Sequence, residues 1–119
     1  MREAWLACCS DPARNGVYEL AGDLPPSVPR LDARTLNAHA SLLVALGELW
    51  HFPEYYGANW DALEECLTDL SWYEGPVLLH LHHAGSLVCS EREMLREVFA
   101  AAADYWKAAG RVCALFLSD

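Results

Sequence analysis

Two continuous apolar runs constrain the fold of this chain more than any other feature. They are Val77-Leu78-Leu79-His80-Leu81 and Val112-Cys113-Ala114-Leu115-Phe116-Leu117. An unbroken run of this kind is typical of a parallel strand covered on both faces, because a strand with one wet face alternates between apolar and polar residues. Helical patterns lie between and before these runs, so the sequence predicts an α/β fold.

The segment between the two runs predicts a helix that ends at Gly110. Ser90-Glu91-Arg92-Glu93 matches a capping box and is expected to open it. Glycine is the usual residue just past a helix end. The side chains expected to face inward are Met94, Leu95, Val98, Phe99, Ala102 and Trp106.

Two further helices are predicted upstream, over residues 38–51 and 58–70, from apolar residues at helical spacing. Val28 to Leu31 forms a short candidate strand, which Pro29 restricts to a strand start or a sheet edge. A chain of 119 residues is expected to form one domain with a core of its own. Within it, residues 1–26 are interpreted as an N-terminal extension and residues 27–119 as the main unit.

The extension contains two short candidate strands, Trp5-Leu6-Ala7-Cys8 and Val17-Tyr18-Glu19-Leu20. Between them, Asp11-Pro12 and Asn15-Gly16 are turn signals. The extension is therefore expected to add short strands to the fold.

The distribution of charge limits the classes of partner. The chain has 17 acidic and 8 basic residues, and no Lys or Arg occurs from Thr35 to Glu91. Such a field repels nucleic acid and attracts a basic protein. Direct RNA or DNA binding is therefore disfavoured.

The cysteines and the hydropathy pattern predict a cytoplasmic protein. No apolar run approaches the roughly 20 residues that span a bilayer, and the apolar part of the N-terminus is short for a signal peptide. An odd count of five cysteines indicates reduced thiols. Cys66 and Cys113 lie in apolar patterns and are expected in the core, while a redox role for Cys8 and Cys9 stays open.

The solvent face of the helix over residues 58–70 carries the strongest functional signal. Asp61, Glu65 and Asp69 are spaced four apart, with Glu64 and Thr68 beside them. Like charges at this spacing destabilise a helix by about a few tenths of a kcal/mol per pair. A merely solvated helix usually interleaves Lys or Arg with its acids, and this one does not. We therefore interpret it as a face that binds a basic partner.

The preceding loop, Pro53-Glu54-Tyr55-Tyr56-Gly57-Ala58-Asn59, adds aromatic surface beside the carboxylates. Tyrosine next to charge suits an interface hot spot. Tyr56 or Trp60 is expected to cover the core, which leaves Tyr55 more exposed. Asn59 is a candidate N-cap for the helix.

The whole segment from Phe52 to Thr68, FPEYYGANWDALEECLT, is similar to the signature segment of the barstar family. A weaker resemblance extends over residues 28–118. It implies a three-stranded parallel sheet packed with three to four helices. It also implies inhibition of a barnase-type ribonuclease, whose active-site cleft is plugged by this helix and loop, with carboxylates in place of RNA phosphates.

The resemblance also implies roles for single residues. Tyr55 matches a tyrosine that covers the catalytic histidine of the enzyme, and Glu65 matches the dominant inhibitory acid. Asp61 matches a second acid and Thr68 a flanking contact, while Trp72 matches a later interface tryptophan through a short insertion. The complete predicted partner-binding set is Tyr55, Gly57, Asn59, Asp61, Glu64, Glu65, Thr68, Asp69 and Trp72.

The chain departs from the family pattern at several of these positions. Glu65 stands where the family has an aspartate, Glu64 replaces a tryptophan, and Asp69 replaces a glycine. A third acidic contact of the family falls near Tyr105, with Asp104 adjacent. These changes leave the acidic plug in place but open the identity of the target. An immunity or regulatory protein that binds another basic partner or toxin is the alternative.

Two other classes compete with an inhibitor. In an enzyme, Asp61 and Glu65 would form a carboxylate pair and Cys66 a nucleophile, but Cys66 is expected to face the core. In a metal-binding module, His80, His82 and His83 would begin a site, but no further ligand lies at typical spacing. We therefore expect no catalytic residues, no metal and no cofactor in a monomer.

Overall fold

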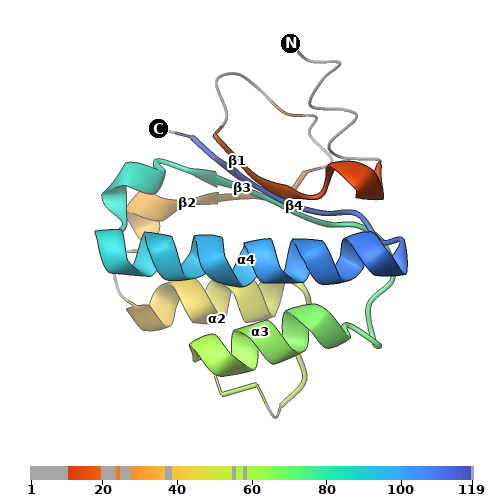
Figure 1. Ribbon diagram of the computed structural model, residues 1–119. Coiled ribbons are helices and arrows are strands. Elements are labelled where there is room, and N and C mark those ends of the chain that lie inside the picture. Colours follow the sequence, from red (N-terminus) through yellow and green to blue (C-terminus); the bar gives the residue numbers. More distant parts are fainter. Residues whose placement is uncertain are drawn as a thin grey trace.

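The computed structural model describes residues 11–19, 24, 28–36, 39–54, 56–57 and 59–118, with the backbone alone at 39–41. It contains a sheet with three α-helices on one face (Figure 1). The strands are β1 (Gly16–Glu19), β2 (Arg30–Asp32), β3 (Val77–His82) and β4 (Cys113–Leu117). The helices are α2 (His39–Leu49), α3 (Trp60–Asp69) and α4 (Cys89–Ala109), with 3-10 turns at η1 (Pro12–Arg14), η2 (Ala33–Thr35) and η3 (Ala84–Ser86).

The described strands form one parallel sheet in the order β1-β4-β3-β2. The two apolar runs of the sequence are the central strands, with Leu79 opposite Leu115 in the register. All five residues of β4 are buried, as are Val77 to Leu81 in β3. The prediction of parallel strands covered on both faces is therefore confirmed.

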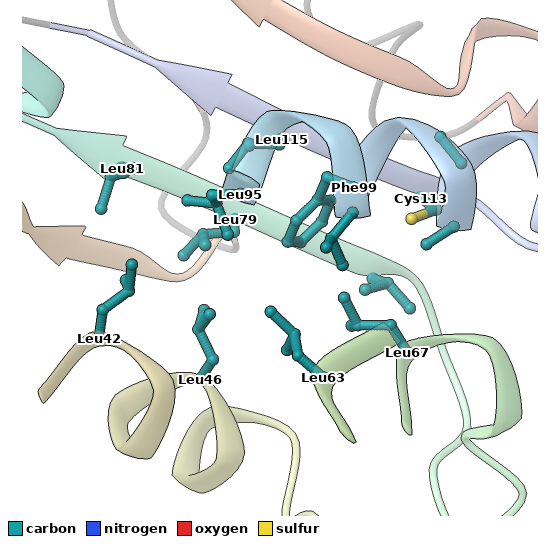
Figure 2. Packing of buried hydrophobic residues seen from close by; sticks show 14 of the residues in the cluster. Leu42, Leu46, Leu63, Leu67, Leu79, Leu81, Leu95, Phe99, Cys113 and Leu115 are labelled. Carbon is teal, nitrogen blue, oxygen red and sulfur yellow. The ribbon is translucent and has the colours of Figure 1, made fainter. Parts of the chain in front are cut away.

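The main core lies between the sheet and the three helices, where leucines from every layer meet (Figure 2). Leu42 and Leu46 of α2 and Leu63 and Leu67 of α3 point toward the strands. Phe99 of α4 lies among them and is fully buried. The helical spacing in the sequence therefore selects the core side of each helix, apart from single positions such as Met94.

The opposite face of the sheet carries a smaller cluster of Val28, Leu78, Ala114 and Phe116. Tyr18 of β1 stacks on Phe116 with 5.7 Å between ring centroids. The sheet has four strands in the described residues, rather than the three that the family resemblance implies, because β1 from the N-terminal segment pairs along β4. The candidate strand at residues 5–8 lies outside the described residues.

Asn15 fixes the start of β1 through hydrogen bonds to two distant elements. Its Nδ2 donates to the carbonyl oxygens of Ala103 at 3.2 Å and Arg111 at 2.9 Å, and its Oδ1 accepts from the backbone N–H of Cys113 at 2.8 Å. The turn signal at Asn15-Gly16 is therefore also a link between β1, β4 and α4.

Three local predictions need correction. The candidate strand at Val28 to Leu31 is shifted, since β2 begins at Arg30, but it is an edge strand as Pro29 indicated. The capping box is wrong, because α4 begins at Cys89 and its N-cap, Val88, makes no side-chain capping bond. Met94 was expected inside and is 37% exposed, since it lies beside the buried stripe rather than in it.

Candidate functional site

Helix α3 is held in place by its cap and by contacts on its inner face. The Oδ1 of Asn59 accepts a hydrogen bond from the backbone N–H of Ala62 at 2.8 Å, which confirms the predicted N-cap. Leu63, Cys66 and Leu67 are buried. The indole Nε1 of Trp106 in α4 donates to the carbonyl oxygen of Leu67 at 2.6 Å. The orientation of α3 on α4 is therefore fixed, and so is the face that it shows to solvent.

That outer face carries the predicted acidic residues. Asp61, Glu64, Glu65 and Asp69 are all exposed. The first three line a shallow depression together with Thr68. The hydroxyl of Thr68 donates to the carbonyl oxygens of Glu64 at 2.9 Å and Glu65 at 3.3 Å. The Thr68 side chain is therefore held against the backbone of its own helix. The structure therefore brings these predicted residues onto one surface, which we call the acidic face.

Ion pairs of the described residues lie elsewhere in the molecule. They join Arg34 and His83 to Asp32, and Arg96 to Glu19. Within the described part of the chain, Asp61, Glu64 and Glu65 make no salt bridge. Asp69 lies in the last turn of α3, where the helix dipole disfavours a negative charge. The acidic face therefore adds repulsion to the isolated fold.

The loop before α3 is anchored by Tyr56, whose hydroxyl donates to the carbonyl oxygen of Leu43 at 2.8 Å. Tyr56 and Trp60 are half-buried and pack against the core, as expected. The side chain of Asn59 lies over Gly57, because a Cβ at Gly57 would approach its Nδ2 to 3.0 Å. A side chain at Gly57 would therefore press on the cap of α3. Tyr55 lies outside the described residues.

Trp72 lies after the C-terminal end of α3 and is half-buried. Its Nε1 donates to the carbonyl oxygen of Trp50 at 3.0 Å, and its ring meets Phe52 edge-on with centroids 6.1 Å apart. The indole N–H is thus engaged within the fold, and a partner would meet only the remaining ring surface.

A protein-family model described as Barstar (barnase inhibitor) matches residues 27–118. This chain belongs to the barstar family. No curated protein matches the sequence. In this barstar-family protein the match covers β2, β3, β4, α2, α3 and α4, whereas β1 lies before it.

Cys66, the nucleophile of the competing enzyme interpretation, is poorly placed for catalysis. Cys66 is 1% exposed and faces the core, as expected. Burial raises the pKa of its thiol, and the carboxylates of Asp69 and Glu65 raise it further. A thiol held protonated inside the core is a weak nucleophile.

The three histidines form a hydrogen-bonded group at the carboxyl ends of β3 and β4. Ser118 Oγ lies 2.7 Å from Nε2 of His80 and 2.9 Å from Nδ1 of His82. The ring of His83 lies tilted against that of His82, with 3.7 Å between centroids, and its Nδ1 is 3.1 Å from Oδ1 of Asp32. Ser118 is a partner that sequence spacing did not suggest, because it follows β4, which is distant from His80 and His82 in the sequence.

No group of three or more His, Cys, Asp or Glu residues in the described ranges is arranged to hold a metal ion. Among the described helices, none combines the length and apolar character that a bilayer crossing requires. The described cysteines, Cys66, Cys89 and Cys113, are free thiols.

One surface feature near the acidic face was missed in the sequence. A hollow between α2 and the following loop is lined by Val44, Gly47, Glu48, His51, Phe52, Pro53, Glu54 and Tyr56. Val44 and Glu48 are four residues apart on the outer side of α2, which is the only sequence signal for it. The hollow itself depends on how Tyr56 packs back on Gly47.

Proposed function

We propose that this protein inhibits a barnase-type ribonuclease by inserting the acidic face and the preceding loop into the active-site cleft of the enzyme. Family membership supports a barnase-inhibitor-like role in general. The observation that carries the specific mechanism is the set of exposed carboxylates on α3. Among the described residues, Asp61, Glu64 and Glu65 form no ion pair.

The chemistry of the target explains why such a face would bind there. A ribonuclease must present cationic groups to the phosphates of RNA, and clefts lined with one sign of charge focus the field. Carboxylates on a rigid helix can occupy phosphate positions without the entropy loss of an extended chain. The repulsion stored on the acidic face of the free protein would be relieved when cations approach.

In this proposal the residues divide by role. Glu65 is the principal acid, Asp61, Glu64 and Thr68 line the same depression, and Asp69 lies farther along the same face. Tyr55 covers a catalytic histidine of the enzyme, and Trp72 contributes ring surface. Gly57 and Asn59 contact the partner from the loop and also set the start of α3.

The protein would act as a stoichiometric binder in the cytoplasm, with no catalytic step, metal or cofactor. Free thiols at Cys66, Cys89 and Cys113 are consistent with a reducing compartment. We assign the main unit to residues 27–119, with residues 1–26 as an extension that adds β1. We expect the free protein to be a monomer.

The test is inhibition of a panel of basic ribonucleases, barnase included, at low salt. We expect tight one-to-one inhibition of at least one member. Glu65→Ala should weaken that complex by about 2–5 kcal/mol, the range of an interface hot spot, and leave the circular dichroism spectrum unchanged. Glu97→Ala, an exposed acid on α4 outside the acidic face, is the matched control.

Three results would count against this function. One is the absence of inhibition across the panel. Another is an unfolded Glu65→Ala variant, which would make Glu65 a structural residue. A third is an association rate that does not change with salt, since steering by exposed charges is screened beyond a Debye length of about 10 Å at 0.1 M.

An immunity or regulatory protein against another basic toxin is the second candidate. The substitutions on the acidic face favour it, since Glu64 and Glu65 extend the carboxylates farther from the helix than shorter acids would. Retention of the protein by an immobilised basic toxin, without ribonuclease inhibition, would select this candidate.

A further inference from the structure

The hollow beside the acidic face has an aromatic floor that the fold holds rigidly. The ring of Tyr56 lies against α2 at Gly47, where an added Cβ would come within 2.7 Å of the ring. Phe52 meets Tyr56 edge-on, with 4.7 Å between the ring centroids. The bond from the Tyr56 hydroxyl to the carbonyl oxygen of Leu43 fixes the ring in this position. The floor is therefore preformed.

The rim of the hollow combines apolar and acidic groups. Val44, which is 46% exposed, and Pro53 contribute aliphatic carbon to the lining. Glu48 and Glu54 are both exposed, and neither forms an ion pair among the described residues. No Lys or Arg lines the hollow. The lining therefore sets two carboxylates against one histidine, His51, among aromatic and aliphatic carbon.

These groups match one kind of side chain. Lys and Arg combine an apolar stem with a cationic end, and they bury the stem along apolar surface while the charge stays at the edge. Carboxylates at the rim can accept hydrogen bonds from the charged end. A planar guanidinium pairs with carboxylate oxygens more readily than an ammonium does, so arginine fits this hollow better.

The hollow and the acidic face are joined by a single short loop. Glu54 and Tyr56 line the hollow, and Asp61 lines the depression on α3 only a few residues later. Figure 1 shows α2 and α3 side by side, with this loop connecting their ends. A partner that contacts both surfaces would therefore span this loop.

We propose that the hollow is a second anchor point, which receives an arginine or lysine side chain of the basic protein that binds the acidic face. This inference rests on the proposed function and adds a contact to it. It makes Glu48, Glu54 and Val44 residues that determine specificity, because only a partner with a cation at the matching distance would fill both sites.

The test uses the complete protein and the ribonuclease that it inhibits most tightly in the panel. Binding is measured by surface plasmon resonance for wild type, Glu65→Ala, Glu48→Gln/Glu54→Gln and the control Glu97→Gln/Glu93→Gln, which removes two α4 acids and the same charge. Measurements at low salt and at about 0.5 M salt separate contact from long-range steering, because exposed charges are screened at the higher salt.

We expect the Glu48→Gln/Glu54→Gln variant to lose about ten- to a hundredfold in affinity, mainly through faster dissociation that persists at high salt. The α4 control should change little beyond its association rate. Val44→Arg places a positive charge of the inhibitor itself at the hollow, where it would compete with the partner's cation. This variant should lose affinity to a similar extent. Circular dichroism confirms that each variant is folded.

The outcomes separate the two proposals. If Glu65→Ala loses affinity while Glu48→Gln/Glu54→Gln matches the α4 control at high salt, the hollow is not an anchor point and the acidic face remains. If Val44→Arg binds as tightly as wild type, the same conclusion holds. If no ribonuclease of the panel binds the wild-type protein, the second anchor is overturned together with the proposed function.

Discussion

The contact between Gly47 and Tyr56 predicts that Gly47→Ala destabilises the protein, although alanine is the better helix former. In an ordinary helix interior the exchange would add about 0.5–1 kcal/mol of stability. Here the new Cβ would lie 2.7 Å from Cε2 and 2.9 Å from Cδ2 of the Tyr56 ring. Separations this short require the ring or the helix to move.

The ring has little freedom to move. Its hydroxyl donates to the carbonyl oxygen of Leu43, and the ring forms a T-shaped contact with Phe52. Forcing an additional carbon into a packed site costs about 1–3 kcal/mol, and loss of the hydroxyl bond adds about 1 kcal/mol. After the propensity gain is subtracted, we expect a net loss of about 1–3 kcal/mol.

Urea unfolding followed by tryptophan fluorescence measures this change, with the denaturant slope as the check on two-state behaviour. The control is the same exchange in a Tyr56→Ala background, where the obstacle is removed. There Gly47→Ala should stabilise by about 0.5–1 kcal/mol. A stabilising Gly47→Ala in the wild-type background, or an equal effect in both backgrounds, would refute the reasoning.

Three further predictions concern stability. Asn15→Ala should lower the free energy of unfolding by about 2–4 kcal/mol, because it leaves a backbone N–H and two carbonyl oxygens without their partner; a thermal unfolding midpoint equal to that of wild type would contradict this. Burial lowers the pKa of His82, with Arg30 next in effect, so the unfolded chain binds the proton first and stability should fall as pH drops below the ordinary histidine value of about 6.5. Urea titrations from about pH 7.5 to about pH 5.5 should show this fall, and His82→Asn, which retains a group at the Nδ1 position, should flatten it; an unchanged slope would exclude His82 as the source. Glu65→Gln should raise the free energy of unfolding by about a few tenths of a kcal/mol in urea, since it removes like-charge repulsion on α3, and a clear loss would mean that the carboxylate supports the fold.

The succession of strands and helices along the chain was predictable because it depends on local patterns. The apolar runs at 77–81 and 112–117 leave no polar face, and only a covered parallel strand accommodates them. The N-cap at Asn59 was predictable for the same reason, since a short acceptor before an amphipathic segment satisfies the first free backbone N–H groups. These features need no knowledge of distant parts of the chain.

The errors arise where a distant contact decides the local structure. A capping box fits Ser90, but Leu87 is buried, Val88 is extended, and the helix already begins at Cys89. The pairing of β1 with β4 depends on Asn15, whose partners are 88 to 98 residues away. The periodicity of apolar residues gives no information on contacts between residues so far apart in the sequence.

The candidate site divides in the same way. The acidic face was predictable because four-residue spacing alone brings its carboxylates together on a helix. The inward placement of Trp72 was not, since it depends on a backbone carbonyl of Trp50 in another segment. Nor was the hollow, whose lining includes Gly47 of α2 and Tyr56 of the following loop, which packs on it.

Helix α3 carries the core contact and the acidic face on opposite sides, and the charges on one side act on the other. Burial raises the pKa of the Cys66 thiol, and the carboxylates of Asp69 and Glu65 raise it further. The charges of the acidic face therefore act on a group on the inner side of the helix. A cationic partner on the acidic face would oppose the field of these charges from outside. Binding and folding are thus linked through the same carboxylates. Their mutual repulsion slightly lowers the free energy of unfolding of the free protein, and a basic partner would gain its affinity from the same groups.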